Sequence, residues 1–255
     1  MKQCSDSPFS LSGKKILITG ASSGIGKACA LFCAELGADI IAIGRNSARL
    51  KETFDQINEL GGENQYIEAD LTDDSQLENI VSNVDSIQGL VFSAGTVNVS
   101  PVAFTDFKKI EDLINVNFKP VAFLTQQLLK KKKLKSGSSV VAISSALGNV
   151  GFMPGNASYG VSKASVEAWM KYCALEYAKK NIRFNCIQPG GIETPMANLE
   201  NLTEEQKKAD ISQVPMGRYG QPEEIAAAAC FLLSDVASYI TGASIAIDGG
   251  RHLKY

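Results

Sequence analysis

Ile16-Leu17-Ile18-Thr19-Gly20-Ala21-Ser22-Ser23-Gly24-Ile25-Gly26 is the first strongly apolar run of the chain together with the glycine-rich turn that follows it. The run is typical of a buried strand, and a helical pattern begins at residue 25. A dinucleotide pyrophosphate needs a turn without bulky side chains and the free N–H groups of a helix N-terminus. The spacing G-x-x-x-G-x-G meets that need, although an ordinary strand–helix turn is the alternative. The stretch therefore predicts an α/β fold with a phosphate-binding first turn.

The same alternation of short β-type runs and longer helical patterns continues to the C-terminus. Several runs, such as residues 40–43, are apolar at consecutive positions, as expected when helices cover both faces of a parallel sheet. Strands are predicted at 15–19, 39–43, 65–68, 89–92, 139–143, 183–187 and 244–247, and helices near 25–36, 47–60, 74–83, 107–134, 158–180 and 222–233. This alternation indicates a doubly wound parallel sheet, the Rossmann fold, with seven strands and helices on both faces. No linker or repeat divides the chain, so one domain is predicted over residues 1–255.

Composition excludes several classes of protein. The net charge of −2 and a pI of about 5.6 do not favour nucleic acid as a partner. The N-terminus lacks the apolar centre of a signal peptide, and the longest apolar run, residues 225–233, is too short to span a bilayer. Six scattered cysteines without a Cys-x-x-Cys pair fit a reducing compartment, and Cys29 and Cys33 are predicted to pack in the core. His252 is the only histidine, which argues against a metal site. We expect a cytoplasmic protein that needs neither a metal nor a membrane.

Tyr159 and Lys163 stand four residues apart within the predicted helix 158–180. Residues at this spacing share a helix face, so the phenol and the ammonium should point into the same space. A nearby cation stabilises the phenolate and lowers the pKa of a tyrosine from its ordinary value of about 10. The pair indicates a tyrosine tuned for general acid–base catalysis, with a chance pairing on a solvated helix as the alternative.

Residues 20–24 also satisfy G-x-S-x-G, the pattern of the nucleophile elbow in α/β-hydrolases. In that interpretation Ser22 would be the nucleophile, and His252 follows it in the order that a hydrolase requires. Two features oppose this hypothesis. The turn follows the first strand of the chain, and His252 sits in a short C-terminal tail with no evident anchor.

The second predicted strand ends in Ile43-Gly44-Arg45-Asn46. A site for NAD usually places an acidic side chain here for the ribose hydroxyls, whereas an arginine suits the 2′-phosphate of NADP. Arg45 therefore favours NADP(H) over NAD(H). The alternative is an arginine that caps a solvated helix.

Together these features resemble the short-chain dehydrogenase/reductase family in its non-extended branch, from about Gly13 to Gly250. Further segments stand in the family's order: Asp70-Leu71, Ser93-Ala94-Gly95, Asn115-Val116-Asn117, Ile143-Ser144-Ser145, Pro189-Gly190-Gly191-Ile192-Glu193-Thr194 and Ile240-Thr241-Gly242. Pro215-Met216-Gly217-Arg218 and the ending Asp248-Gly249-Gly250 resemble the 3-oxoacyl-[acyl-carrier-protein] reductases, a resemblance shared with many sugar, ketone and steroid reductases. The family usually has Asn where this chain has Ser93.

The resemblance implies hydride transfer between a nicotinamide and a carbonyl, with the protein positioning and polarising the reactants. Tyr159 would be the acid–base residue and Lys163 its partner, while Ser145 would polarise the substrate carbonyl and Asn117 would hold a water in a proton relay. The cofactor would lie against Gly20, Ser22, Ser23, Gly24, Ile25, Gly26, Arg45, Asp70, Leu71, Ser93, Ala94, Gly95, Tyr159, Lys163, Pro189, Gly190, Ile192 and Thr194.

Lys130-Lys131-Lys132-Lys133-Leu134-Lys135 closes the predicted long helix, where cations complement the helix dipole and Gly137 can serve as the C′ residue. A sharper hypothesis is that this run, with Lys179 and Lys180, docks an acidic acyl carrier protein. Residues 195–214 interrupt the strand–helix rhythm and are predicted to form a lid over the substrate, with a helix pair packed on the body as the alternative.

The sequence thus predicts an NADPH-dependent oxidoreductase that reduces a carbonyl compound, with 3-oxoacyl thioesters among the candidate substrates. Family members are often tetramers, so the resemblance also implies a homotetramer. Two other functions remain open: an NAD(P)H-binding regulatory or scaffold protein without turnover and, less favoured, the hydrolase.

Overall fold

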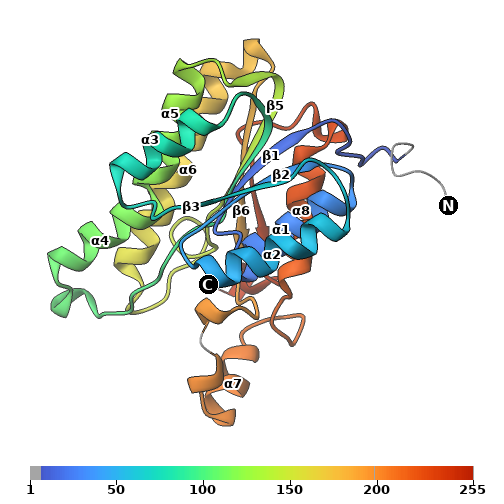
Figure 1. The fold of residues 1–255 in the computed structure, drawn as a ribbon. Coiled ribbons are helices and arrows are strands. Elements are labelled where there is room, and N and C mark those ends of the chain that lie inside the picture. The colour runs from blue at the N-terminus through green and yellow to red at the C-terminus, as the bar shows by residue number, and fades with distance from the viewer. Residues whose placement is uncertain (1–6, 198, 255) are drawn as a thin grey trace.

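A seven-stranded parallel sheet forms the centre of the molecule (Figure 1). The computed structural model describes residues 7–197 and 199–254, so Cys4 and Asn198 lie outside the described part. The strands are β1 (Lys15–Thr19), β2 (Asp39–Gly44), β3 (Gln65–Glu68), β4 (Ile87–Phe92), β5 (Leu134–Ile143), β6 (Arg183–Pro189) and β7 (Ser244–Ile247). Their order is β3-β2-β1-β4-β5-β6-β7, and the predicted doubly wound sheet of seven strands is confirmed.

Helices cover both faces of this sheet, as predicted. They are α1 (Gly24–Glu35), α2 (Ser47–Glu59), α3 (Asp74–Asn83), α4 (Phe107–Asn117), α5 (Lys119–Lys130), α6 (Ala157–Tyr177), α7 (Glu204–Ile211) and α8 (Pro222–Leu233). Figure 1 shows α1, α2 and α8 on one face and α3, α4, α5 and α6 on the other. Helix α7 follows two short 3₁₀ turns and stands away from the sheet, within the segment predicted as a lid.

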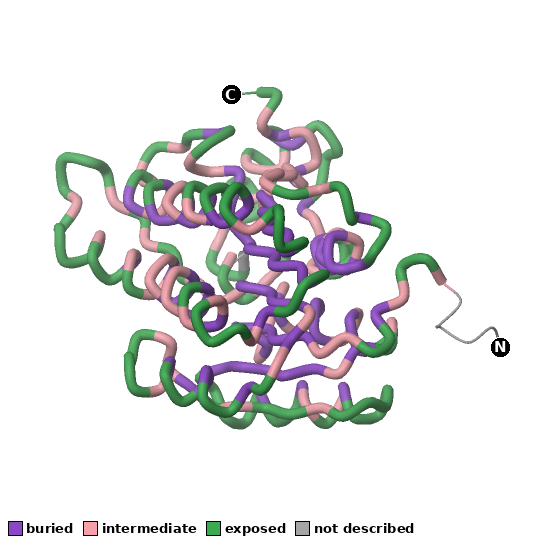
Figure 2. Tube along the Cα trace, turned by 90° about the horizontal axis from the view of Figure 1, so that it is seen from above, coloured by how far each residue is buried: buried purple, intermediate pink, exposed green. Residues whose placement is uncertain are grey.

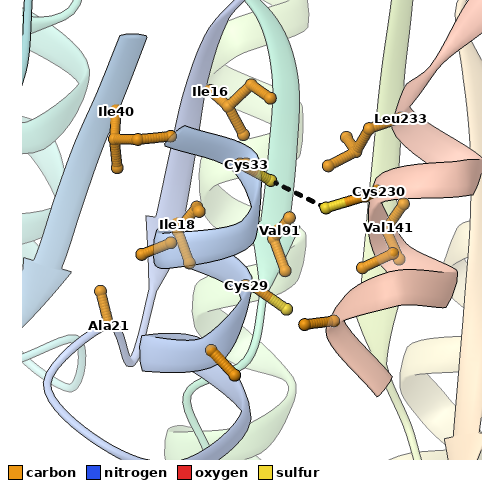
Figure 3. Packing of buried hydrophobic residues seen from close by; sticks show 14 of the residues in the cluster. Ile16, Ile18, Ala21, Cys29, Cys33, Ile40, Val91, Val141, Cys230 and Leu233 are labelled. Carbon is orange, nitrogen blue, oxygen red and sulfur yellow. Dashed lines mark hydrogen bonds between the residues drawn. The ribbon is translucent and has the colours of Figure 1, made fainter. Parts of the chain in front are cut away.

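Two apolar layers hold the helices to the sheet, because successive strand residues point to opposite faces. Ile16 and Ile18 of β1 belong to the layer under α1 and α8, and Leu17 belongs to the layer under α3, α5 and α6. Figure 2 shows the buried strands between helices whose outer sides are exposed. In the first layer the Sγ atoms of Cys33 on α1 and Cys230 on α8 lie 3.6 Å apart (Figure 3), and Cys29 and Cys33 are fully buried, as predicted.

The predicted helix over residues 107–134 is wrong, because the chain forms two helices there. Helix α4 ends at Asn117, Phe118 lies between the two, and α5 begins at Lys119 with Pro120 in its first turn. A proline lacks the N–H that a helix interior requires, but the first turn of a helix has no acceptor for that N–H. Pro120 was the signal in the sequence for this break.

The lysine run is also placed differently from the prediction. Helix α5 ends at Lys130, Lys132 has a left-handed backbone with φ of 55°, and β5 begins at Leu134. The Nζ of Lys133 donates to the carbonyl oxygens of Val81 and Val84 beside the end of α3. Gly137 lies inside β5 and is not a helix C′ residue. Only part of the run therefore complements a helix terminus.

Two features are absent from the described part of the chain. No helix in residues 7–197 and 199–254 is both long and apolar enough to cross a membrane. In the same residues no group of three or more His, Cys, Asp or Glu side chains is arranged to hold a metal ion.

The turn between β1 and α1 depends on two close backbone approaches. Gly20 has φ of +70°, and a Cβ added to it would lie 2.8 Å from the backbone nitrogen of Ala94 after β4. A Cβ on Gly26 would lie only 2.2 Å from the carbonyl oxygen of Gly20. Side chains at these two positions would force α1 away from β1 and β4. The turn therefore brings the ends of the two central strands together.

We expect Gly26→Ala to destabilise the protein. Helix propensity alone would favour alanine by about 1 kcal/mol, but overpacking against a backbone oxygen costs about 1–3 kcal/mol. The overlap at 2.2 Å is severe, so we expect the free energy of unfolding to fall by about 2 kcal/mol in urea denaturation. The control is Lys27→Ala, which removes a surface ion pair to Glu52 and should change stability little. Equal stability of Gly26→Ala and wild type would contradict the packing argument.

Candidate active site

The order of the strands reverses between β1 and β4, at the centre of the sheet. From β1 the chain proceeds through β2 to β3 on one side, whereas β4 to β7 lie on the other, so the loops after β1 and β4 separate in opposite directions. Open parallel sheets bind ligands at such a switch point. The glycine turn and the segment Ser93-Ala94-Gly95 meet there.

The start of α1 fits a bound pyrophosphate. Ser23 is the N-cap residue, its side chain makes no capping hydrogen bond, and the first turn of α1 carries no acidic side chain. The first N–H groups of α1 are thus uncapped by side chains, and the helix dipole favours an anion at this end of the helix. A Cβ on Gly24 would lie 3.2 Å from the Thr194 side chain, so the loop after β6 closes the other side of this cradle. These residues fit the dinucleotide that the sequence predicts.

Arg45 and Asp70 lie next to each other at the ends of β2 and β3. An Arg45 guanidinium nitrogen is 3.7 Å from Oδ2 of Asp70, and the arginine side chain is 80% exposed. Hydrogen bonds from the backbone N–H and the hydroxyl of Thr72 hold the pKa of Asp70 below its usual range, and Arg45 lowers it further. Asp70 is therefore anionic at neutral pH and is the partner of Arg45.

Thr19 holds the segment after β4 in place. Its hydroxyl oxygen accepts hydrogen bonds from the backbone N–H groups of Ser93 at 3.1 Å and Ala94 at 3.3 Å. The Ser93 side chain is not needed for these contacts, so the departure from the family's Asn leaves this anchor intact. Sequence reasoning missed Thr19, although its place as the last residue of β1 was visible.

Asn117 is buried and its side-chain amide is engaged. Oδ1 accepts from the N–H of Thr96 at 2.8 Å, while Nδ2 donates to the carbonyl of Thr96 and to the hydroxyl of Ser162, each at 2.9 Å. The amide thus fastens the loop after β4 to α4 and α6. Both N–H groups of Nδ2 are engaged and Oδ1 accepts one hydrogen bond, so the second lone pair of Oδ1 is the part of this amide left for the water relay that the sequence analysis expected.

Ser145, Tyr159 and Lys163 converge beside Gly95. Ser145 follows β5 and is hydrogen-bonded to Tyr159 in the first turn of α6. The Nζ of Lys163 donates to the carbonyl oxygen of Ile143 at 2.9 Å and lies 5.9 Å from the centre of the Tyr159 ring. A Cβ on Gly95 would lie 3.3 Å from this Nζ and 3.2 Å from Oδ1 of Asn117. Contacts therefore link the four predicted catalytic residues: Asn117 and Lys163 meet at Gly95 after β4, and Lys163 lies beside the ring of Tyr159, which is bonded to Ser145.

The expected lowering of the Tyr159 pKa by Lys163 is wrong for this structure. Burial raises the pKa of Tyr159, and the hydrogen bond with Ser145 acts in the opposite direction. Burial also lowers the pKa of Lys163 to about 8. The Lys163 ammonium donates its hydrogen bond to the carbonyl of Ile143. Its contact with Tyr159 is with the face of the ring, at 5.9 Å from the ring centre.

The loop after β6 supplies the remaining predicted cofactor residues. Pro189 ends β6, and the N–H of Gly190 donates to the carbonyl of Ile247 at 3.0 Å. Ile192 is buried and pairs with Gly220, while Thr194 lies over the glycine turn. Leu71, at the end of β3, packs against the apolar layer under α3 and α5.

His252 has an anchor that the sequence did not reveal. Its Nδ1 lies 2.9 Å from Oδ2 of the buried Asp248, which also accepts the backbone N–H of His252 at 2.7 Å. A Cβ on Gly44 would lie 3.2 Å from the Ser22 Oγ, so Ser22 lies at the end of β2, whereas His252 follows β7 at the opposite edge of the sheet. Ser22 and His252 therefore form no catalytic pair, and the hydrolase hypothesis is wrong.

Two further polar residues of α6 escaped the sequence analysis. Ser162 accepts from Asn117, and Glu167 lies four residues after Lys163 with only 2% exposure. The signal for Glu167 was present, because positions 159, 163 and 167 share one helix face. An acidic residue on the helix face that packs on the sheet indicates a buried charge, so Glu167 could have been identified from the sequence.

Known proteins resemble the chain over nearly its whole length. The family described as enoyl-(acyl carrier protein) reductase matches residues 20–252. The 3-oxoacyl-[acyl-carrier-protein] reductase of Thermotoga maritima is 38% identical over 244 residues, covering 94% of this chain and 98% of that protein. The 2,5-dichloro-2,5-cyclohexadiene-1,4-diol dehydrogenase of Sphingobium indicum is 37% identical over 247 residues, covering 94% and 96%.

A solved structure supports the same relationship. A protein from Agrobacterium tumefaciens, assigned as a 2-deoxy-D-gluconate 3-dehydrogenase and crystallised with bound NADP, superposes with a TM-score of 0.87. It is 34% identical, and the match covers 96% of this chain and 99% of that one. Sequence motifs, sheet order and relatives agree. The chain belongs to the short-chain dehydrogenase/reductase family, whose members are nicotinamide-dependent oxidoreductases acting on CH–OH and C=O groups.

Proposed function

We propose that this protein reduces a carbonyl group to a secondary alcohol, reversibly, with NADPH. The observation that carries the proposal is the meeting of Ser145, Tyr159, Lys163 and Asn117 at the end of β4, beside the glycine turn. The relative from Thermotoga maritima makes 3-oxoacyl thioesters the first substrate class to test. The relative from Sphingobium indicum, a cyclohexadienediol dehydrogenase, makes cyclic alcohols the second.

Each of the four site residues has a distinct role in the proposed reaction. The bound cofactor supplies the hydride. The Tyr159 hydroxyl donates the proton to the carbonyl oxygen, and its raised pKa keeps it protonated at neutral pH. Ser145 orients the carbonyl through its hydroxyl, and Lys163 stabilises the phenolate that remains after the proton has left. Asn117 fixes the loop against which the nicotinamide would lie.

The ends of β2 and β3 support the preference for NADPH. Arg45 is largely exposed, and its only charged neighbour in the described chain is Asp70 at 3.7 Å. This contact is long, so the guanidinium can turn toward a 2′-phosphate with little loss. Asp70 and Leu71 would then flank the adenine, and Ile192 and Thr194 the carboxamide.

We also propose that residues 195–214 form a lid over the substrate. Helix α7 in this segment is tied to the C-terminal end of the chain, since Oδ1 of Asp210 lies 2.6 Å from the Arg251 guanidinium. The Tyr219 hydroxyl donates to the other oxygen of Asp210 at 2.9 Å. The lid therefore has a fixed base near β7, while Met196 at its start is partly exposed toward solvent.

Replacing Tyr159 by phenylalanine separates an enzyme from a regulatory or scaffold protein. We expect Tyr159→Phe to lower kcat by about 10²-fold or more, because the proton donor is lost, while NADPH still binds. NADPH oxidation by a panel of ketones, sugars and 3-oxoacyl thioesters gives kcat, and cofactor fluorescence gives the Kd. Tyr172→Phe, an exposed position on the same helix, is the matched control. A wild-type protein that binds NADPH but turns over no member of the panel would support the scaffold hypothesis instead.

Arg45 tests the cofactor preference. A charge-assisted contact to a phosphate is worth about 1.5–3 kcal/mol, so Arg45→Ala should raise the KM for NADPH by about tenfold or more. The KM for NADH should change little, because NADH lacks the 2′-phosphate. Arg49→Ala, exposed one turn later on α2, serves as the control. An equal effect on both cofactors would argue against a contact between Arg45 and the 2′-phosphate.

The lysine run, where an acidic carrier protein would dock, lies far from the active site of the same subunit. Lys130–Lys132 precede β5, whereas Ser145 follows it, so the ten residues of this strand separate them by roughly 30 Å. Lys133 is engaged by α3 and is no part of a free surface. We propose that a carrier docked on Lys131 and Lys132 serves the active site of a second subunit, in a homotetramer located in the cytoplasm.

Charge reversal tests this docking. Lys131→Glu/Lys132→Glu should raise the KM for carrier-bound substrate by about tenfold, because opposite charges steer and hold the complex. Turnover of a small ketone, measured on the same preparation, should stay at the wild-type rate. Equal loss on both substrates, or no loss on either, would remove the docking hypothesis.

A further inference from the structure

A buried carboxylate lies beneath the catalytic residues and has no part in the proposed chemistry so far. Oε1 of Glu167 on α6 accepts from the Ser144 hydroxyl at 2.7 Å and from Nε2 of Gln188 at 2.9 Å. Oε2 lies 3.0 Å from the same Nε2 and accepts from the Ser244 hydroxyl at 3.1 Å. Ser144 directly follows β5, Gln188 lies near the end of β6, and Ser244 is the first residue of β7. One side chain thus joins α6 to three adjacent strands.

The surroundings are built for the ionised form of Glu167. The amide nitrogen of Gln188 can only donate, and the hydroxyls of Ser144 and Ser244 are placed to donate as well. Burying a carboxylate costs several kcal/mol unless its oxygens are satisfied in this way. The neighbouring inward positions Val166 and Met170 are apolar, so the packing of α6 does not itself require a charge. A carboxylate that needs a dedicated set of donors from three strands in order to be buried indicates a role for its charge.

The network reaches the catalytic residues through the backbone. Ser144 directly precedes Ser145, and its hydroxyl is also 3.2 Å from the carbonyl oxygen of Lys163. The Lys163 ammonium in turn donates to the carbonyl of Ile143, one residue before Ser144. Glu167 therefore holds the end of β5 against the helical turn that carries Tyr159 and Lys163.

We propose that Glu167 is a positioning residue of the reductase site: its buried carboxylate keeps Ser145 in register with Tyr159 and keeps the Lys163 ammonium charged. This inference rests on the proposed function for its catalytic consequence. Its structural and electrostatic parts concern the protein alone and can be measured without any substrate.

The charges around Lys163 give the direction of the effect. Tyr159 and Glu167 face it from α6, and Cys186 faces it from β6. From β5 the neutral carbonyl of Ile143 accepts its hydrogen bond, and the neutral Asn117 amide of α4 lies near it, since a Cβ on Gly95 would approach both. Burial lowers the pKa of Lys163 to about 8, and Cys186 and then Glu167 act to raise it. Burial raises the pKa of the Cys186 thiol, which is therefore neutral at pH 8, so Glu167 is the anion that supports the ammonium.

The direct test is a titration of Lys163 by NMR in protein labelled with ¹³C at lysine Cε. The Lys163 signal is identified by its absence in Lys163→Arg and should titrate near pH 8 in the wild type. In Glu167→Gln we expect its midpoint to fall by about one pH unit, because the nearby negative charge is gone. Glu176→Gln, exposed on the same helix, and Ser244→Ala, which removes one hydrogen bond but keeps the charge, should leave the midpoint unchanged.

Kinetics test the positioning part. The alkaline limb of kcat/KM for carbonyl reduction should move to lower pH in Glu167→Gln by the same amount as the NMR midpoint. At pH 6.5 or below, where Lys163 is still largely charged, the remaining fall in kcat of about tenfold reports the loosened Ser145. An unchanged midpoint together with an unchanged kcat would overturn the inference. A lower midpoint with wild-type kcat would overturn the positioning of Ser145.

The inference stays testable if the Glu167→Gln variant does not fold, and also if the wild type reduces no carbonyl compound. If Glu167→Gln does not fold, Glu167→Leu/Gln188→Leu replaces the buried polar pair by apolar side chains, and the same drop of the Lys163 midpoint is expected. If the wild type reduces no carbonyl compound, the proposed function fails, but the NMR midpoint still decides whether Glu167 holds Lys163 charged. A midpoint that stays at the wild-type value in the double variant would refute that role.

Discussion

The close approach of β1 and β4 at the glycine turn is the constraint on which the rest of the molecule depends. Parallel strands end at one edge of a sheet, so the loops after β1, β2, β4, β5 and β6 all gather there. Gly20 and Gly26 allow the backbone of α1 to pass directly over the end of β1 and against Ala94. The start of α1 therefore lies at the same edge of the sheet as the predicted catalytic residues of α6, which follows β5.

The site is built from buried polar groups that satisfy one another. The Asn117 amide is bonded to Thr96 and Ser162, the Lys163 ammonium to Ile143, and the Glu167 carboxylate to three strands. Such a network is rigid, because breaking one of its hydrogen bonds leaves a buried polar group unpaired, which costs about 1–3 kcal/mol. Such rigidity suits an enzyme in which the cofactor supplies the reactive hydride and the protein supplies orientation.

Regular elements and local motifs could be predicted because they depend on short-range patterns. The strands are indicated by short apolar runs, the glycine turn by its spacing, and the shared helix face of Tyr159 and Lys163 by the period of 3.6 residues. The predictions were wrong where the conformation or the pKa of a residue depends on groups that are distant in sequence but close in space. Pro120 divides a helix that looked continuous, and the contacts of Lys133 with the end of α3 draw the lysine run toward β5. The Tyr159 pKa is raised because burial outweighs the hydrogen bond with Ser145, and burial depends on the packing of the whole chain.

By itself the sequence determined the doubly wound sheet, the glycine-rich turn before α1 and the shared helix face of Tyr159 and Lys163, since each depends on residues close together along the chain. Tertiary structure alone decided that His252 is held by Asp248, that Arg45 lies beside Asp70, and that Glu167 joins α6 to β5, β6 and β7. These contacts link residues whose proximity depends on how strands pair and how far side chains are removed from water. Burial and long-range pairing have no local signature, so only the folded molecule reveals which polar groups meet.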